Sequence, residues 1–158
     1  MMRSSPLAVL LLFTAANAPS QTPAEPSAVR CDAVLTAEEA VVGDGHQGPA
    51  VDEPRPGFTS CDWQGDGSNF GFTFASLKAL AADERSADDE FEFDVQALES
   101  ESTKREVLPG IGVKAAILPA GEDAFAVIVQ RTDGVARMIT YKVEREKALA
   151  LARALATP

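Results

Sequence analysis

The clearest pattern in the chain is an alternation of aromatic residues with small or polar ones. It places phenylalanine at every second position of one segment: Phe70, Phe72 and Phe74. A period of two predicts a half-buried strand with its aromatic side turned inward. A strand at about 59–63 and a glycine-rich turn at 65–68 precede it, so the two strands are predicted to form a hairpin.

The C-terminal half predicts three more strands and a helix. The strands are expected at Val113–Leu118, Ala124–Gln130 and Val135–Val143. Asp133-Gly134 is a hairpin turn signal between the last two strands. A final helix is predicted at about 144–156, because its apolar residues recur at helical spacing. These residues are Ala148, Leu151, Ala152 and Leu155.

The acidic segment Asp83–Asp94 holds seven acids and one base and begins a stretch that fits two structures. Its apolar residues alternate as in a strand but also fit a helical spacing: Phe91, Phe93, Val95 and Leu98. Ser86 is a favourable N-cap, acids follow it, and basic residues stand near Lys104, all of which suit a helix dipole. We predict a helix over about 87–104, with a strand over 87–98 as the alternative.

Two further segments lie between the cysteines. Thr36 and Glu39 have the spacing of a capping box, which predicts a short helix that ends at Gly43. Asp44–Gly57 is rich in glycine and proline and is predicted to be loop. The elements together predict an α+β fold, in which an antiparallel sheet of about five strands carries helices packed on one face.

The N-terminus has the layout of a secretory signal peptide. Arg3 is followed by the apolar stretch Pro6–Phe13 and then by small residues. The stretch is far shorter than the roughly 20 residues that span a bilayer, so a retained membrane helix is not expected. Cleavage after Ala18 and cleavage after Ala16 are the two alternatives.

The chain is therefore expected to have three parts: a signal peptide at 1–18, a proline-rich flexible tether at 19–30 and one globular domain at 31–156. Export places the mature protein in the periplasm or outside the cell. We expect no stable membrane insertion after cleavage.

Cys31 and Cys61 are the only cysteines. An even count in an exported chain predicts a disulfide between them. The bond would close a loop of about 30 residues and stabilise the fold by roughly 3.5–4 kcal/mol. A reactive thiol would need Cys-x-x-Cys spacing or a histidine close by, and neither is present. Cys31 follows Arg30 rather than the apolar stretch, so a lipid anchor on it is not expected.

The charge balance narrows the range of partners. The chain has 14 basic and 24 acidic residues, a formal charge of −10. Removal of the leader takes away Arg3 and no acid, which leaves 13 bases against 24 acids, or −11. A nucleic-acid partner is not expected, because phosphate binding requires clustered Lys and Arg. A basic protein partner is favoured by the same field.

Several short motifs carry a resemblance to a known family. The motifs are Cys31-Asp32-Ala33-Val34-Leu35-Thr36, Cys61-Asp62-Trp63 and Gly110-Ile111-Gly112-Val113-Lys114-Ala115. A last helix that contains Leu151-Ala152 follows them. The chain resembles a family of small bacterial envelope proteins, secreted or lipid-anchored, that is classed as a domain of unknown function. That family's pattern is Cys-x-Leu-Leu-Thr, Cys-Thr-Trp and Gly-x-Gly-Asp-x-Ala. The chain lacks the lipid-anchor cysteine of many relatives, so the resemblance implies a free form, and the family supplies no catalytic residues.

The chemistry-bearing residues do not form a recognisable catalytic or metal centre. His46 is the only histidine and lies in a glycine-rich segment without a nucleophile motif. Asp62 and Asp66 have the spacing of a calcium loop, but Thr73 stands where the bidentate glutamate is required. We therefore expect no catalytic residues, no metal and no cofactor.

The sequence thus favours a non-catalytic binding module of the cell envelope whose ligand is a protein or a small molecule. The candidate ligand-contact residues are Trp63, Phe70, Phe72 and Phe74. The alternative is an acidic inhibitor of a basic secreted hydrolase, in which the acidic helix would occupy the enzyme's cleft.

Overall fold

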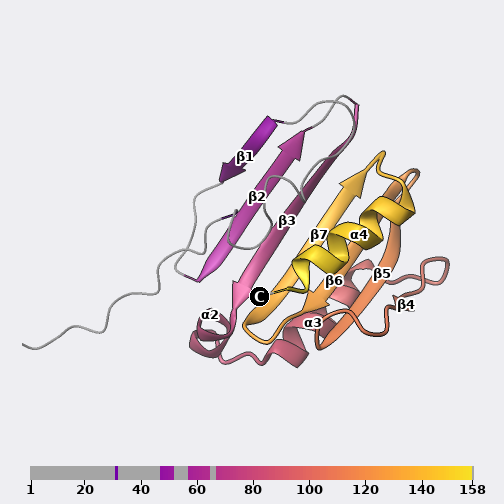
Figure 1. Ribbon diagram of the computed structural model, residues 1–158. Helices are drawn as coiled ribbons and strands as arrows, with labels where there is room; N and C mark the ends of the chain where they lie inside the picture. Colours follow the sequence, from indigo (N-terminus) through magenta and orange to yellow (C-terminus); the bar gives the residue numbers. More distant parts are fainter. Residues whose placement is uncertain (1–30, 32–46, 52–56, 65–66, 158) are drawn as a thin grey trace, which may run out of the picture.

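The computed structural model describes residues 31, 47–51, 57–64 and 67–157. Its elements are β1 (Gln47–Val51), β2 (Phe58–Gln64), β3 (Asn69–Ser76), α2 (Leu77–Ala82), α3 (Ala87–Leu98), β4 (Glu106–Val107), β5 (Lys114–Gly121), β6 (Ala124–Gln130), β7 (Gly134–Tyr141) and α4 (Arg145–Leu155). The strands form one antiparallel sheet in the order β1-β2-β3-β7-β6-β5-β4 (Figure 1). The predicted leader, the tether, the capping box at Thr36 and His46 lie outside the described residues.

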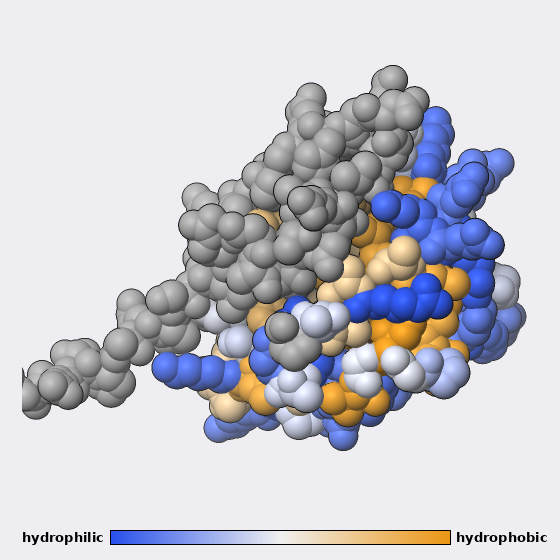
Figure 2. All heavy atoms as spheres, in the orientation of Figure 1, coloured by the Kyte–Doolittle hydropathy of each residue, from blue (hydrophilic) through white to orange (hydrophobic). Residues whose placement is uncertain are grey.

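One side of the sheet packs against α4, and we call it the α4 face. Its core is built from aromatic residues of β2 and β3 and aliphatic residues of β5–β7. Every second residue of a strand points to the same side, which is why all three alternating phenylalanines reach this core. The helix contributes the four residues that its spacing predicted: Ala148, Leu151, Ala152 and Leu155. Figure 2 views this side of the molecule and shows hydrophobic and hydrophilic residues side by side on its surface.

The opposite side, the α3 face, packs against α2 and α3. Its core includes Leu80 and Phe91 from these helices and Ala116, Leu118 and Ile128 from the strands. In Figure 1, α4 crosses in front of β5–β7 and α3 lies behind them. The two helices therefore cover the same strands from opposite sides.

The predicted α+β class, antiparallel sheet and helix cover are confirmed, but two details were wrong. Helices lie on both faces rather than on one, and the sheet of the described residues has seven strands rather than about five. Four consecutive residues of β5 and five of β6 are buried, which requires cover on both sides. The additional strands are the two edges, β1 and the two-residue β4.

Strand β1 corrects the prediction of loop over Asp44–Gly57. Its residues include Gly48 and Pro49, which weaken an interior strand. The strand lies at the edge, and its register with β2 shifts between Gln47 and Ala50. An edge position with a local irregularity is where a sheet tolerates these residues.

Helix α3 begins as predicted but ends earlier. The Ser86 hydroxyl accepts from the Asp89 amide at 3.0 Å, and the Asp89 carboxylate accepts from the Ser86 amide at 3.3 Å. The helix ends at Leu98, not near Lys104, and the strand alternative for 87–98 was wrong. Helix α2 was not predicted at all; the Ser76 hydroxyl caps it by accepting from the Ala79 amide.

Arg105 is one of the basic residues predicted near the end of the helix, but it lies beyond the end of α3. It turns back after the loop and its guanidinium donates to both carboxylate oxygens of Glu99, each at 3.0 Å, and to Glu92 at 2.8 Å. These hydrogen bonds tie Arg105, at the end of the loop, back to residues of α3 and its C-cap.

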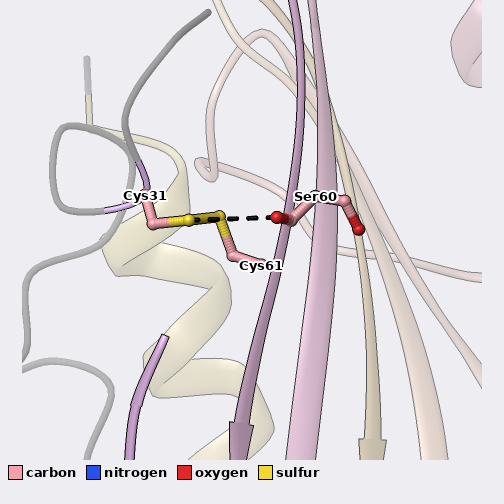
Figure 3. The surroundings of a disulfide bond; sticks show 3 residues. All are labelled: Cys31, Ser60 and Cys61. Carbon is pink, nitrogen blue, oxygen red and sulfur yellow. Dashed lines mark hydrogen bonds between the residues drawn. A yellow bond between two sulfur atoms is a disulfide. The ribbon is translucent and has the colours of Figure 1, made fainter. Parts of the chain in front are cut away.

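The predicted disulfide joins Cys31 to Cys61, with the two Cα atoms 6.0 Å apart (Figure 3). Both residues belong to the core of the α4 face. The Cys31 sulfur lies 3.9 Å from the carbonyl oxygen of Ser60. The bond fixes the residue that follows the predicted tether to the middle of β2.

Replacing Glu99 should weaken the fold in a pH-dependent way. Hydrogen bonds from Arg105 lower the pKa of Glu99 to about 2, from an ordinary value of 4.5. A lowered pKa stabilises the native state above the ordinary value, and this contribution is lost as the pH falls toward about 2. We expect Glu99→Gln to lower the melting temperature at pH 7, with the difference shrinking below pH 4.5 and disappearing near pH 2.

Glu101→Gln is the matched control, since Glu101 is an exposed acid of the same loop without an ion pair among the described residues. Thermal unfolding monitored by circular dichroism across this pH range measures both variants. Equal effects of the two substitutions, or a difference that persists at pH 2, would contradict the role given to Glu99.

Candidate functional site

In the part of the chain that the structure describes, the α3 face is covered over β5–β7 but open over β2, β3 and the end of β7. The side chains of the open half form rows that cross the strands. One row is Asp62, Gly71 and Ile139, and the next is Ser60, Thr73 and Arg137. Asn69 and Tyr141 belong to the row beyond. We call these eight residues the uncovered half.

Gly71 leaves a gap in the first row, and the gap is the floor of a hollow. The hollow has a volume of about 290 Å³ and is lined by Ser60, Asp62, Asn69, Thr73, Arg137 and Ile139. A Cβ atom added at Gly71 would overlap the Asp62 carboxylate. The Asp62 side chain therefore leans over the space that the glycine leaves free. We call this feature the Gly71 hollow.

The wall of the hollow nearest α3 is an ion pair. Arg137 donates from Nη1 to Asp94 Oδ1 at 3.2 Å, which joins β7 to the helix. Asp94 is only 8% exposed, whereas Arg137 is partly exposed. Burial raises the pKa of Asp94, and the nearby Arg137 and Arg85 oppose that shift in part. The buried carboxylate thus fixes one side of a guanidinium whose other side reaches the hollow.

The opposite wall is a carboxylate without a counter-ion. Asp62 is exposed and forms no ion pair with any residue that the structure describes. Ile139, which is 40% exposed, lies across Gly71 on β7, and Tyr141, 45% exposed, follows in the next row. The arrangement offers a free negative charge, hydroxyl and amide groups and an apolar wall in one place.

The aromatic residues predicted to contact a ligand lie on the other side of the sheet. Trp63, Phe70, Phe72 and Phe74 are at most 2% exposed. The Trp63 ring stacks on Phe70 and on Phe72, with centroid distances of 4.9 and 5.2 Å. Phe72 also borders the Gly71 hollow, so of the four it alone touches the site. In the structure these residues pack the core beside the disulfide, and the site is made by residues that alternate with them.

Sequence reasoning missed this site although the signal was present. The positions between the phenylalanines, Gly71 and Thr73, define the reverse side of the same strand. The apolar residues of the alternation predict the core side of the strand, and the prediction made no use of the residues between them. Which helix covers that reverse side depends on contacts between residues far apart in sequence, such as Asp94 and Arg137.

A second hollow of about 470 Å³ lies near the β5–β6 turn and the end of β7, on residues that include Asp123, Phe125 and Lys142. The Lys142 amide donates to the Asp123 carbonyl at 2.8 Å and closes the two turns against each other. Arg145 in its lining is paired with Glu106 at 2.6 Å. The Gly71 hollow is the stronger candidate because all of its lining residues lie on strands, whereas part of the second lining lies on turns.

Comparison with family models, curated proteins and solved structures found no match for this chain. In the part of the chain that the structure describes, no helix combines the length and the apolar character needed to cross a membrane.

Two glycines should respond very differently to the same substitution. A Cβ at Gly134 would overlap the Ala75 carbonyl oxygen and approach the Phe74 ring to 2.7 Å, so backbone would have to move. At Gly71 the exposed, flexible Asp62 carboxylate would have to turn away, and the Cys61 carbonyl oxygen, 3.3 Å from the Cβ, would have to give only slightly. We expect Gly134→Ala to reduce the free energy of unfolding by about 1–3 kcal/mol, and Gly71→Ala to leave it within about 1 kcal/mol of the wild type.

Urea unfolding of the two variants measures the difference. Comparable destabilisation by both would mean that the Gly71 hollow is a packed part of the fold and not a free space.

Proposed function

We propose that this protein is an exported, non-catalytic binding module that takes its ligand on the uncovered half of the α3 face. The observation that carries the proposal is the Gly71 hollow, where Asp62, which has no ion pair with a described residue, stands opposite the anchored Arg137. A polar hollow with an apolar wall, on a rigid sheet, is the usual composition of a small binding site.

Two features support export. The sequence begins with a signal-peptide pattern, and the chain carries a disulfide of the kind that persists in oxidising compartments. The periplasm and the outside of the cell both satisfy this condition. The resemblance of the cysteine and glycine motifs to a family of bacterial envelope proteins supports the same location.

The chemistry of the site favours binding over catalysis. Asp94 is buried against Arg137, so it is not free to exchange a proton with a substrate. Among the described residues, Asp62 is the one carboxylate that lines the hollow, whereas hydrolysis of a glycoside uses a pair. We therefore assign the site residues to recognition.

The inhibitor alternative has less support. It requires the acids of α3 to be free for a basic enzyme, but four of its five acids are held by bases of this chain, and the fifth, Asp89, accepts hydrogen bonds from Ser86. The pairs are Asp88 with Lys114, Glu90 with Arg85, Glu92 with Arg105 and Asp94 with Arg137. An acid already paired gains less from a new partner.

Affinity capture from the organism's envelope extract tests the proposal. The immobilised mature domain is compared with Gly71→Val, which fills the hollow, and with Ile139→Lys, which places a charge on its wall. We expect both variants to lose at least about tenfold of the specifically bound protein or small molecule, because a filled site excludes its ligand.

Val107→Lys is the matched control, since Val107 is an exposed apolar strand residue on β4, at the far edge of the sheet. Retention of the captured material by Gly71→Val and Ile139→Lys would rule out the uncovered half as the binding surface. A capture that survives Gly71→Val and Ile139→Lys but is weakened at high salt would instead indicate the charge-driven inhibitor complex.

A further inference from the structure

We infer that the Gly71 hollow takes a primary alkylammonium group whose stem carries a carbonyl, the chemistry of a lysine residue. The inference rests on the proposed function and names the ligand class of that site. Three properties of the described residues lead to it: the charge balance of the hollow, its shape and its hydrogen-bonding groups.

The charge balance favours a cation. Asp94 and Arg137 neutralise each other across the α3–β7 contact at 3.2 Å. Asp62 is then the remaining charge of the lining, and it has no ion pair among the described residues. A ligand that brings one positive charge completes the pairing, whereas an anion would be repelled by Asp62.

The shape favours a slender stem ending in a small charged head. The floor is the backbone at Gly71, flanked in register by Asp62 on β2 and Ile139 on β7. An alkyl chain laid along Ile139, which is 40% exposed, would place its terminal nitrogen at the carboxylate that leans over Gly71. An ammonium suits the position because it is compact and has donors that rotate.

The hydrogen-bonding groups favour an acceptor on the ligand. Asp94 holds only Nη1 of Arg137, and no other N–H of that guanidinium has an acceptor among the described residues. A carbonyl near the stem accepts from Arg137, as the backbone of a lysine residue does. The Ser60 and Thr73 hydroxyls can turn to either partner.

The whole molecule favours the same class of ligand. Its formal charge of −10, or −11 without the leader, attracts cations to the surface before any specific contact forms. Asp62 is the acid that lines the hollow, so it can turn the general attraction into a defined contact.

NMR titration of the mature domain with four small probes tests the inference. Nα-acetyl-lysine N-methylamide represents a lysine residue within a polypeptide, and free lysine represents a metabolite source. Nα-acetyl-norleucine N-methylamide lacks the ammonium, and 1,5-diaminopentane lacks the carbonyl. One of the two lysine probes represents the natural ligand, and we expect it to bind at least about tenfold more tightly than the norleucine probe and the diamine. The norleucine probe cannot donate to Asp62, and the diamine cannot accept from Arg137, so each loses a charge-assisted hydrogen bond.

Variants locate the binding. Asp62→Asn should weaken the lysine probe at least about tenfold, Gly71→Val should abolish its binding, and the charge-matched control Asp83→Asn should leave it unchanged. Asp83 is exposed and lies at the C-terminus of α2, away from the hollow.

Three results would overturn the inference. The first is equal affinity for the norleucine probe, and the second is binding that Asp62→Asn does not change. The third is the lack of a saturable shift with any probe at 50 mM, on the order of the weakest affinities that matter for so small a ligand. If the envelope capture still depends on Gly71 while the lysine probes fail, the binding function stands and the ligand class is wrong. If both fail, the site itself is wrong.

Discussion

One helix, held at both sides by ion pairs, decides which part of the sheet remains open. Asp88 of α3 pairs with Lys114 of β5 at 2.7 Å, and Asp94 pairs with Arg137 of β7 at 3.2 Å. Strands lie about 4.8 Å apart, so seven of them span roughly 30 Å, whereas a helix with its side chains is about 10–12 Å wide. A helix fixed over β5–β7 therefore cannot reach β2. The partly exposed pairs contribute little stability by themselves, but they specify where the helix lies.

The two faces of the sheet consequently have different roles. The α4 face is filled with aromatic residues, closed by α4 and connected to Cys31 by the disulfide, so it provides the stability of the β2–β3 half. Because that half is supported from one side, its reverse side can carry polar residues and a glycine. The strand β3 expresses both roles at once, with Phe72 in the core and Gly71 in the hollow.

Much of the fold could be predicted from local patterns, because local patterns determine it. The alternation at Phe70–Phe74, the N-cap at Ser86 and the spacing of Leu151 and Leu155 each specify an element without help from the rest of the chain. The end of α3 could not be predicted, since it depends on Arg105 returning to Glu99 through a loop. The helix cover on both faces was readable only from the continuous apolar runs of β5 and β6.

The site was harder to predict for the same physical reason. Its parts come from β2, β3, β7 and α3, and the ion pair that bounds it joins residues 43 positions apart. The aromatic residues beside Cys61 attracted attention because large apolar side chains dominate binding energies, yet the sheet buries them. The functional signal lay in the small and polar residues between them, and only the pairing of the strands brings these together.

The binding function requires the uncovered half to be occupied where the protein works. Hydroxyl-radical footprinting, performed on the purified domain and on the protein within its intact envelope, measures this directly. We predict that labelling of Ile139 and Tyr141 falls in the envelope. Phe93 and Val107 are exposed outside the uncovered half, so their labelling should not change. Equal labelling of Ile139 and Tyr141 in the two settings would contradict it.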